Sequence, residues 1–308
     1  MAWQPSARLA VIQARARLYR QIRAFFAASH CLEVDTPLLA TSTNTNVGLA
    51  SIRARHLNQE LYLQTSPEFA MKRLLAVGSG SIYQICHAFR EGEQGRLHRS
   101  EFTLLEWYRI GFDYHRLMDE MEQLINYLSG QQNSFSRIRY GDLLMWQAGI
   151  DIHAISLGEL RKQCLLKVPG TEVAQLGFDQ CLDLLLSFEI IPTLQDYVFV
   201  YDYPVTQAAL ARVGRHDPRV AERFELFYGG VELANGFSEL TDAQQQRARF
   251  MVDNRKRQQQ GLPVYPMDED LLAALESGLP ECAGVALGLD RLLMVFEQLD
   301  SIDQVMTF

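Results

Sequence analysis

The feature that most constrains the fold is the Gly229-Gly230 pair, which lies between two β-prone runs at 224–228 and 231–237. Adjacent glycines readily adopt the positive φ angles of a two-residue turn, so we predict a β-hairpin with Tyr228 opposite Val231. Phe227 then faces Glu232, and Glu225 faces Ala234. Side-chain alternation places these four on one face and Leu226 and Leu233 on the other.

The two glutamates of this hairpin are predicted to be diagonal neighbours. Diagonal positions on paired strands lie roughly 7–8 Å apart, near enough for Glu225 and Glu232 to converge on one hard cation. The alternative is an edge hairpin whose glutamates are solvated, since carboxylates often have only a structural role. The segment by itself leaves both possibilities open.

Composition limits the class of protein. The chain has 308 residues, of which 48% are hydrophobic and 21% charged, and this is typical of a globular protein with a substantial core. A net charge of −8 argues against a broad basic surface for nucleic acid. No apolar run approaches the roughly 18 residues that span a bilayer. The N-terminal segment has no secretory signal, and the five cysteines show no C-x-x-C spacing. We therefore expect a cytoplasmic protein with reduced thiols and no membrane association.

The order of predicted elements favours an antiparallel α+β domain, because strands are scattered among helices without a regular βαβ rhythm. No repeat or long linker divides the chain, so we predict one domain over residues 1–308. Strands are expected at 32–37, 61–65, 82–89, 101–108, 197–201 and 282–287. Helices are expected after Ser6, at 66–77, 115–129, 156–167, 178–188, 241–261 and 268–276, and from Gly288 onward.

Two further segments carry candidate anion-binding arginines. The loop at 90–99 contains three arginines, whose guanidinium groups bind carboxylates and phosphates in a bidentate manner. The alternative is a solvated charged loop. The run from Gly284 to Arg291 places an arginine at the start of a helix, where backbone N–H groups already favour an anion. Here the alternative is Asp290 as a plain N-cap, with Arg291 in a surface ion pair.

Together these segments resemble the three motifs of the class II aminoacyl-tRNA synthetase catalytic domain, in its lysyl branch. The run at 32–37, Leu-Glu-Val-Asp-Thr-Pro, looks like motif 1, which builds the dimer interface in that family. Phe89-Arg90 through 101–108, Glu-Phe-Thr-Leu-Leu-Glu-Trp-Tyr, looks like motif 2, and 284–291 looks like motif 3. The resemblance implies an antiparallel sheet flanked by helices and a homodimer.

The resemblance also implies a role for each matching residue, with ATP and Mg²⁺ as cofactors. Arg90 matches the arginine that holds the amino-acid carboxylate near the α-phosphate. His98 and Phe102 match ATP contacts, and Arg291 matches the γ-phosphate arginine. Glu225 and Glu232 match the magnesium ligands, which also contact ATP. Glu68 matches the acid that binds the α-amino group, whereas Tyr108, Asn235 and Glu239 match the lysine pocket, with Glu239 at the ε-ammonium.

Motif 2 departs from the family pattern. The usual Phe-Arg-Asn-Glu is Phe89-Arg90-Glu91-Gly92 here, so an acid is absent or moved to Glu93. The usual His-Asn-Pro-Glu-Phe is His-Arg-Ser-Glu-Phe at 98–102.

The length before motif 1 favours a particular branch of the family. About thirty residues leave no room for the anticodon-binding β-barrel of a lysyl-tRNA synthetase, so we expect no such domain and no tRNA binding. The chain resembles the elongation factor P lysine lysyltransferases, which activate lysine, preferably (R)-β-lysine, with ATP and pass it to a lysine of elongation factor P. Ala286 fits that resemblance, because lysyl-tRNA synthetases have glycine there; ordinary core packing is its alternative.

The expected chemistry is adenylation followed by amide formation. A lysine carboxylate attacks the α-phosphorus of ATP, while Arg90, Arg291 and Mg²⁺ on the two glutamates neutralise growing negative charge. The first alternative is an enzyme that charges tRNA or another small acceptor. The second is a non-catalytic regulatory paralogue, against which the retained charged residues argue.

Overall fold

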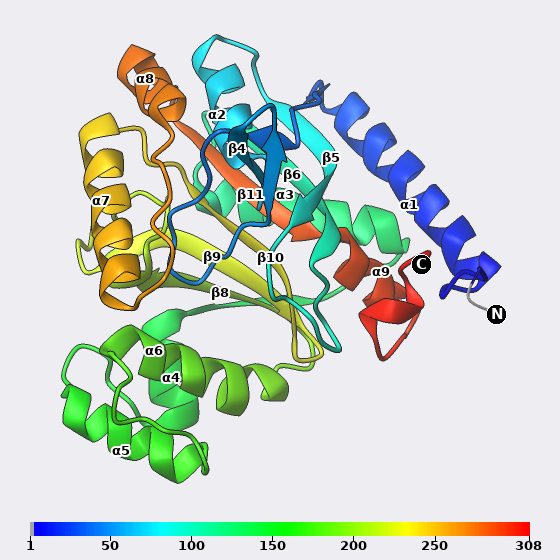
Figure 1. Cartoon of the computed structure of the whole chain (residues 1–308). Coiled ribbons are helices and arrows are strands. Elements are labelled where there is room, and N and C mark those ends of the chain that lie inside the picture. Colours follow the sequence, from blue (N-terminus) through cyan, green and yellow to red (C-terminus); the bar gives the residue numbers. More distant parts are fainter. Residues whose placement is uncertain (1–2) are drawn as a thin grey trace. The chain divides into compact units, whose positions relative to one another are not determined.

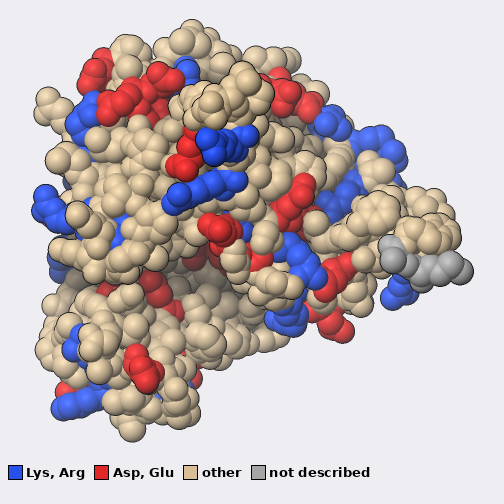
Figure 2. Space-filling view, in the orientation of Figure 1, with Lys and Arg blue, Asp and Glu red and all other residues tan. Residues whose placement is uncertain are grey.

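The computed structural model describes residues 3–308, which form two compact units. The first unit contains residues up to 131 together with 238–308, and the second contains residues 132–237. Within the described part of the chain, no helix has both the length and the apolar character needed to cross a membrane. On the face seen in Figure 2, basic and acidic side chains are interspersed rather than gathered into one broad patch.

The main sheet strands of the first unit follow the order β1-β5-β6-β11. They are β1 (Leu32–Glu33), β5 (Ile82–Phe89), β6 (Glu101–Ile110) and β11 (Cys282–Gly288). β1 pairs with β5 in parallel, whereas β5–β6 and β6–β11 are antiparallel. A smaller antiparallel sheet has the order β2-β4-β3, from β2 (Leu39–Ala40), β4 (Gln59–Leu63) and β3 (Arg53–His56). The predicted α+β class is correct, and the β1–β5 pair is an exception to its antiparallel rule.

Six α-helices accompany these strands in the described part of the first unit (Figure 1). They are α1 (Leu9–Ala28), α2 (Glu68–Ala76), α3 (Tyr114–Ser129), α7 (Ala243–Gln259), α8 (Glu269–Gly278) and α9 (Leu289–Phe296), with a 3₁₀ turn η4 at Ile302–Gln304. Asp113 and Asp268 cap α3 and α8 by accepting backbone N–H groups. Phe26 of α1 stacks on Tyr83 of β5, with ring centroids 4.5 Å apart.

The central strand β6 is buried from Thr103 to Arg109, and its two faces have different uses. On one face Trp107 and Arg109 both donate to Glu120 of α3, at 2.9 Å. This buried ion pair is fully hydrogen-bonded, so it fixes α3 on the sheet. Glu106 and Tyr108 lie on the opposite face, because side chains alternate along a strand.

The strands of the second unit follow the order β10-β9-β8-β7. They are β10 (Val231–Ser238), β9 (Val220–Tyr228), β8 (Tyr197–Pro204) and β7 (Phe135–Arg139). β7–β8 is parallel and the other two pairs are antiparallel. Helices α4 (Tyr140–Ala148), α5 (Leu157–Lys167) and α6 (Phe178–Leu185) belong to this unit (Figure 1). Their buried side chains form one apolar cluster with those of β8. A π-turn η1 (Leu186–Ile190) and two 3₁₀ turns, η2 (Ile191–Thr193) and η3 (Val205–Gln207), complete the unit.

The predicted hairpin is present, but its register is only partly as predicted. Tyr228 pairs with Val231 and Phe227 with Glu232, as expected from a two-residue Gly-Gly turn with φ of 55° and 75°. A β-bulge between Glu232 and Ala234 then shifts the pairing, so Glu225 lies opposite Asn235 rather than Ala234. The prediction that Ala234 shares a face with Glu225 was therefore wrong. Asn235 takes that place, and Ala234 pairs with Leu226.

Candidate active site

A buried cluster of charged and polar side chains lies in the first unit. We call it the carboxylate pocket, and it consists of Glu68, Lys72, Glu106, Tyr108 and Glu239. Each of these residues is at most 9% exposed. Three of them, Glu68, Tyr108 and Glu239, were predicted from the sequence, and the structure brings them together. The other two were not singled out, although Glu106 lies within motif 2.

Local structure fixes the first carboxylate. Glu68 is the first residue of α2, where an acidic side chain is favoured by the helix dipole. The hydroxyl of Ser66 accepts the backbone N–H of Glu68 at 3.1 Å and donates to Oε1 of Glu106 at 2.6 Å. Glu106 also accepts the Tyr108 hydroxyl at 3.1 Å on Oε2. Strand β6 and the start of α2 are thus joined through Ser66.

Lys72 lies one helical turn after Glu68, and its ammonium group contacts two carboxylates. Nζ is 2.6 Å from Oε1 of Glu68 and 2.5 Å from Oε2 of Glu239. The spacing of four residues places the side chains of Glu68 and Lys72 on the same side of α2. This spacing was visible in the sequence, but only the fold shows that Lys72 faces inward.

Glu239 directly follows β10 and is held by a backbone bond from its N–H to the carbonyl of Cys282, at 3.0 Å. Its Oε1 is buried and has no hydrogen-bond donor among the described residues. A buried carboxylate oxygen without a donor is unfavourable, by roughly 1–3 kcal/mol or more for a charged group. An incoming ammonium group would satisfy this atom.

Burial governs the electrostatics of the pocket. It raises the pKa of Glu106 to about 8, with the charge of Glu68 adding to the effect and the bonds from Ser66 and Tyr108 opposing it. Burial likewise raises the pKa of Glu239 to about 8, against the attraction of Lys72. For Lys72, attraction to Glu239 and Glu68 outweighs burial and raises the pKa. Burial therefore makes the ionised forms of Glu106 and Glu239 costly unless a cation lies beside them.

Strand β11 forms a wall beside this cluster. Gly284 pairs with Tyr108 and Ala286 pairs with Glu106, so both lie on the pocket face of the sheet. A Cβ atom on Gly284 would be 2.3 Å from the Tyr108 ring and 2.5 Å from Oε1 of Glu239. Only glycine allows these two side chains to approach the strand so closely. Ala286, predicted to shape the pocket, is placed opposite its buried glutamate.

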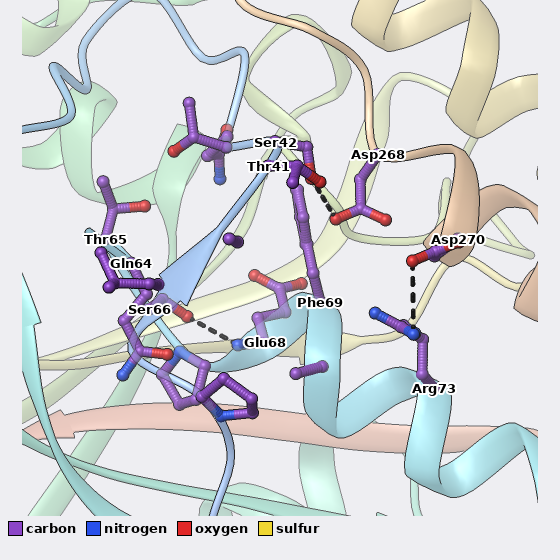
Figure 3. A pocket seen from close by; sticks show the side chains of 17 residues that line it. Thr41, Ser42, Gln64, Thr65, Ser66, Glu68, Phe69, Arg73, Asp268 and Asp270 are labelled. Atoms are coloured by element: carbon purple, nitrogen blue, oxygen red, sulfur yellow. Dashed lines mark hydrogen bonds and ion pairs between the residues drawn. The ribbon is translucent and has the colours of Figure 1, made fainter. Parts of the chain in front are cut away.

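Glu68 also lines a cavity of about 270 Å³ (Figure 3). Ser66 and Gln64 lie beside it at the end of β4, and the opposite wall includes Ser42, which donates to Asp268 at 2.6 Å. The buried carboxylate pocket is therefore connected to a hollow through Glu68.

Arg90 begins the motif 2 loop, and its guanidinium group has an N–H that could still donate a hydrogen bond to a ligand. Its guanidinium lies 4.9 Å from the centroid of the Phe102 ring, and its Nη1 is 3.5 Å from Glu93. The Nε atom is buried and has no hydrogen-bond partner among the described residues. Glu93 therefore lies next to Arg90.

The third motif contacts the second through Arg291 and Asp290. The Nη2 atom of Arg291 lies 2.8 Å from Nε2 of His98, and its Nε donates to the carbonyl of Leu97. Asp290 accepts from Arg15 at 2.5 Å and from the Thr103 N–H at 2.6 Å. Gly288 is the N-cap of α9, so the alternative that Asp290 is a plain N-cap is wrong. Asp290 instead ties α9 to β6 and α1.

The remaining predicted residues, Glu225, Glu232 and Asn235, lie in the second unit. Glu225 is 8% exposed and accepts both the Tyr203 hydroxyl, at 2.6 Å, and Arg223. The Nε of Arg223 donates to Oδ1 of Asn235 at 3.2 Å. β9 is flanked by β8 and β10, so the alternative of a solvated edge hairpin is wrong for Glu225.

Burial raises the pKa of Glu225, Arg223 opposes this rise, and the charge of Glu232 adds to it. The pair fits Mg²⁺ chemically, because Mg²⁺ is usually held by one or two carboxylates together with waters and substrate phosphates. No group of three or more His, Cys, Asp or Glu residues within 3–308 is arranged around a common metal position. Arg223, which sequence reasoning missed, forms an ion pair with the Glu225 side chain.

The family model for tRNA synthetases class II (D, K and N) matches residues 2–308. The chain belongs to this family, and its use of ATP follows from that membership.

The chain is also similar to curated proteins named elongation factor P (R)-β-lysine ligase. Those of Vibrio cholerae and Pseudoalteromonas translucida are each 46% identical to it, and that of Edwardsiella ictaluri is 44% identical. The alignments cover 99–100% of this chain and 97% of each relative.

Proposed function

We propose that this chain is a ligase that activates lysine, in its (R)-β form, with ATP and transfers it to a lysine side chain of elongation factor P. The observation that carries the proposal is the carboxylate pocket, which presents three buried carboxyl groups to a ligand that brings ammonium groups. The proposal is also supported by sequence similarity to relatives named elongation factor P (R)-β-lysine ligase, which extends along nearly their whole length.

The pocket accounts for recognition of a diamino acid. Glu68 is assigned to the amino group near the carboxylate and Glu239 to the ε-ammonium, with Tyr108 contributing to side-chain recognition. Asn235, in the second unit, is assigned to lysine from the family resemblance alone. Glu239 has a buried oxygen without a donor, so a substrate that lacked the ε-ammonium would leave it unsatisfied. A site built around such a group rejects the analogue that lacks it.

Arg90 is assigned to the substrate carboxylate. A carboxylate oxygen attacks the α-phosphorus of ATP, the bond to the bridging oxygen breaks, and pyrophosphate leaves. The guanidinium of Arg90 offsets charge that grows on the α-phosphate, and Arg291 with His98 holds the far end of the triphosphate. Phe102 offers an aromatic ring for the adenine. Positioning and charge neutralisation supply the rate increase, with no covalent enzyme intermediate.

The adenylate is then consumed by an amine. The uncharged ε-amino group of the acceptor lysine attacks the acyl carbon, an amide bond forms, AMP leaves, and the amine loses a proton. We assign no residue of this chain as the base for that proton.

Glu225 and Glu232 are assigned to Mg²⁺. The ion supplies Lewis-acid neutralisation of phosphate oxygens when it is bound. The Arg223 side chain limits the negative charge on Glu225, so we expect the pair to bind the ion together with nucleotide phosphates rather than tightly by itself.

Ala286 is proposed to favour the β-amino acid. It lies opposite Glu106. One methyl group on a pocket wall changes the relative binding free energy of two similar substrates, here the α and β isomers of lysine, by about 1–3 kcal/mol.

We further propose that residues 1–308 act as one catalytic domain, since the family model spans both units. A homodimer through the motif 1 region and α1, a cytoplasmic location and the absence of tRNA binding are part of the same proposal. The location follows from the acceptor, which is a translation factor.

Mass spectrometry of elongation factor P after incubation with ATP, Mg²⁺ and either lysine isomer tests the function. We expect the mass of one lysyl group to be added, with (R)-β-lysine preferred. Transfer of labelled lysine to total tRNA instead would support the tRNA-charging alternative. Absence of lysine-dependent ATP–pyrophosphate exchange would support a non-catalytic paralogue.

A further inference from the structure

We propose that Lys72 is the internal counterion of the carboxylate pocket and that it thereby makes the pocket selective for substrates with two ammonium groups. The inference rests on the proposed function, because it concerns the same lysine site. Lys72 acts through Glu68 and Glu239 and does not itself have to contact the substrate.

The geometry gives Lys72 this position. Its side chain is 1% exposed, and its ammonium group contacts Glu68 and Glu239, which are the two carboxylates assigned to the substrate amines. A buried lysine is otherwise costly, and these two contacts stabilise its charged form. One ammonium group therefore already lies between the two carboxylates before a substrate arrives.

The number of charges in the pocket explains why Lys72 favours substrates with two ammonium groups. When Glu68, Glu106 and Glu239 are all ionised, Lys72 offsets one of the three charges and two remain. A substrate with two ammonium groups matches these two charges, and its own carboxylate matches Arg90. A substrate with one ammonium group, such as norleucine, leaves one buried carboxylate without a partner. Without Lys72, three charges would remain, and the pocket would hold an additional proton instead of binding lysine tightly near neutral pH.

The charged and titratable groups of the pocket come from several elements. Lys72 contacts Glu68, on its own helix α2, and Glu239, which follows β10. Glu106 and Tyr108 on β6, and Arg90 after β5, act on these two carboxylates electrostatically or through Glu106. Burial raises the pKa of Glu106 and Glu239 to about 8 each, so ionisation of these carboxyls is disfavoured in the free pocket near pH 7. Binding of two ammonium groups ionises both carboxyls, so lysine binding should release protons at that pH.

The test compares the full chain with three variants: Lys72→Met, Lys72→Arg and the exposed control Lys162→Met, whose side chain is 71% exposed. The readout is lysine-dependent ATP–pyrophosphate exchange at pH 6.5 to 9.5. For Lys72→Met we expect the lysine KM to rise at least tenfold at pH 7, with kcat changed far less. The ratio of the Lys72→Met KM to the wild-type KM should fall as pH rises, because the carboxyls then ionise even without Lys72. Lys72→Arg should restore the wild-type pH profile, and Lys162→Met should retain it.

An unchanged KM and pH profile in Lys72→Met would overturn the inference. A KM increase that is equal at every pH would also overturn it, because it would indicate a structural role only. If the variant does not fold, calorimetry on the wild-type chain decides. Titration with lysine at pH 7 in two buffers of different ionisation enthalpy should show proton release, and no release would overturn the inference. A wild-type chain without lysine-dependent exchange would instead overturn the proposed function, and the inference with it.

Discussion

Replacing Gly284 by alanine should selectively damage lysine recognition. The new methyl carbon would lie 2.3 Å from two atoms of the Tyr108 ring and 2.5 Å from Oε1 of Glu239. Neither neighbour can move into solvent, since both are at most 3% exposed. Overpacking of this kind costs about 1–3 kcal/mol, and displacement of the Tyr108 hydroxyl from Glu106 adds about 1 kcal/mol.

A cost of about 2–4 kcal/mol in the lysine complex corresponds to a roughly 30- to 900-fold higher lysine KM. The assay is lysine-dependent ATP–pyrophosphate exchange, with the ATP KM measured in parallel and expected to change little. Gly158→Ala is the matched control, because a Cβ there meets only the Ser156 hydroxyl at 4.0 Å. A Gly284→Ala variant with wild-type lysine KM would refute the close approach of Tyr108 and Glu239 to β11.

The remaining predictions concern the carboxylates. Glu239→Gln should abolish lysine activation but preserve ATP binding, as measured by nucleotide titration; unchanged use of lysine would place the pocket elsewhere. Glu232→Ala should remove Mg²⁺-dependent exchange while the melting temperature stays near wild type, and retained exchange would contradict the metal assignment. Burial raises the pKa of Glu106 to about 8 in the folded state, so the folded state keeps a proton over a pH range in which the unfolded state has lost it. The stability that this proton contributes is fully present below the unfolded pKa and is lost as pH rises through 8. Glu106→Gln should therefore flatten the fall in melting temperature between pH 5 and 8, and an unchanged slope would count against burial of this carboxyl.

Much of the fold follows from local patterns that the sequence displays. The Gly-Gly pair correctly predicted the turn and the pairing of Tyr228 with Val231, because turn geometry determines register near the turn. The pairing of Glu225 was wrong, because the bulge at Leu233 adds a residue that no composition signal marks. Such bulges depend on tertiary packing, which a single strand sequence does not contain.

The site was predicted mainly through resemblance to the family motifs. Periodicity alone could not show that Lys72 faces Glu239, since these residues are distant in sequence and meet only in the folded unit. Arg223 was missed for a related reason, because its contact with Glu225 requires the actual strand positions. Gly284 was quoted only as part of a motif, and its steric role depends on the register of β11 against β6.

The lysine that this chain activates is proposed to pass to a protein. The most direct measurement is intact-mass analysis of elongation factor P incubated with this chain, ATP, Mg²⁺ and (R)-β-lysine, with α-lysine in a parallel reaction and Glu239→Gln as the inactive control. We expect the added mass of one lysyl group on elongation factor P, more with the β isomer, and none with the control. An unchanged mass with both isomers, together with labelled lysine on tRNA, would contradict it.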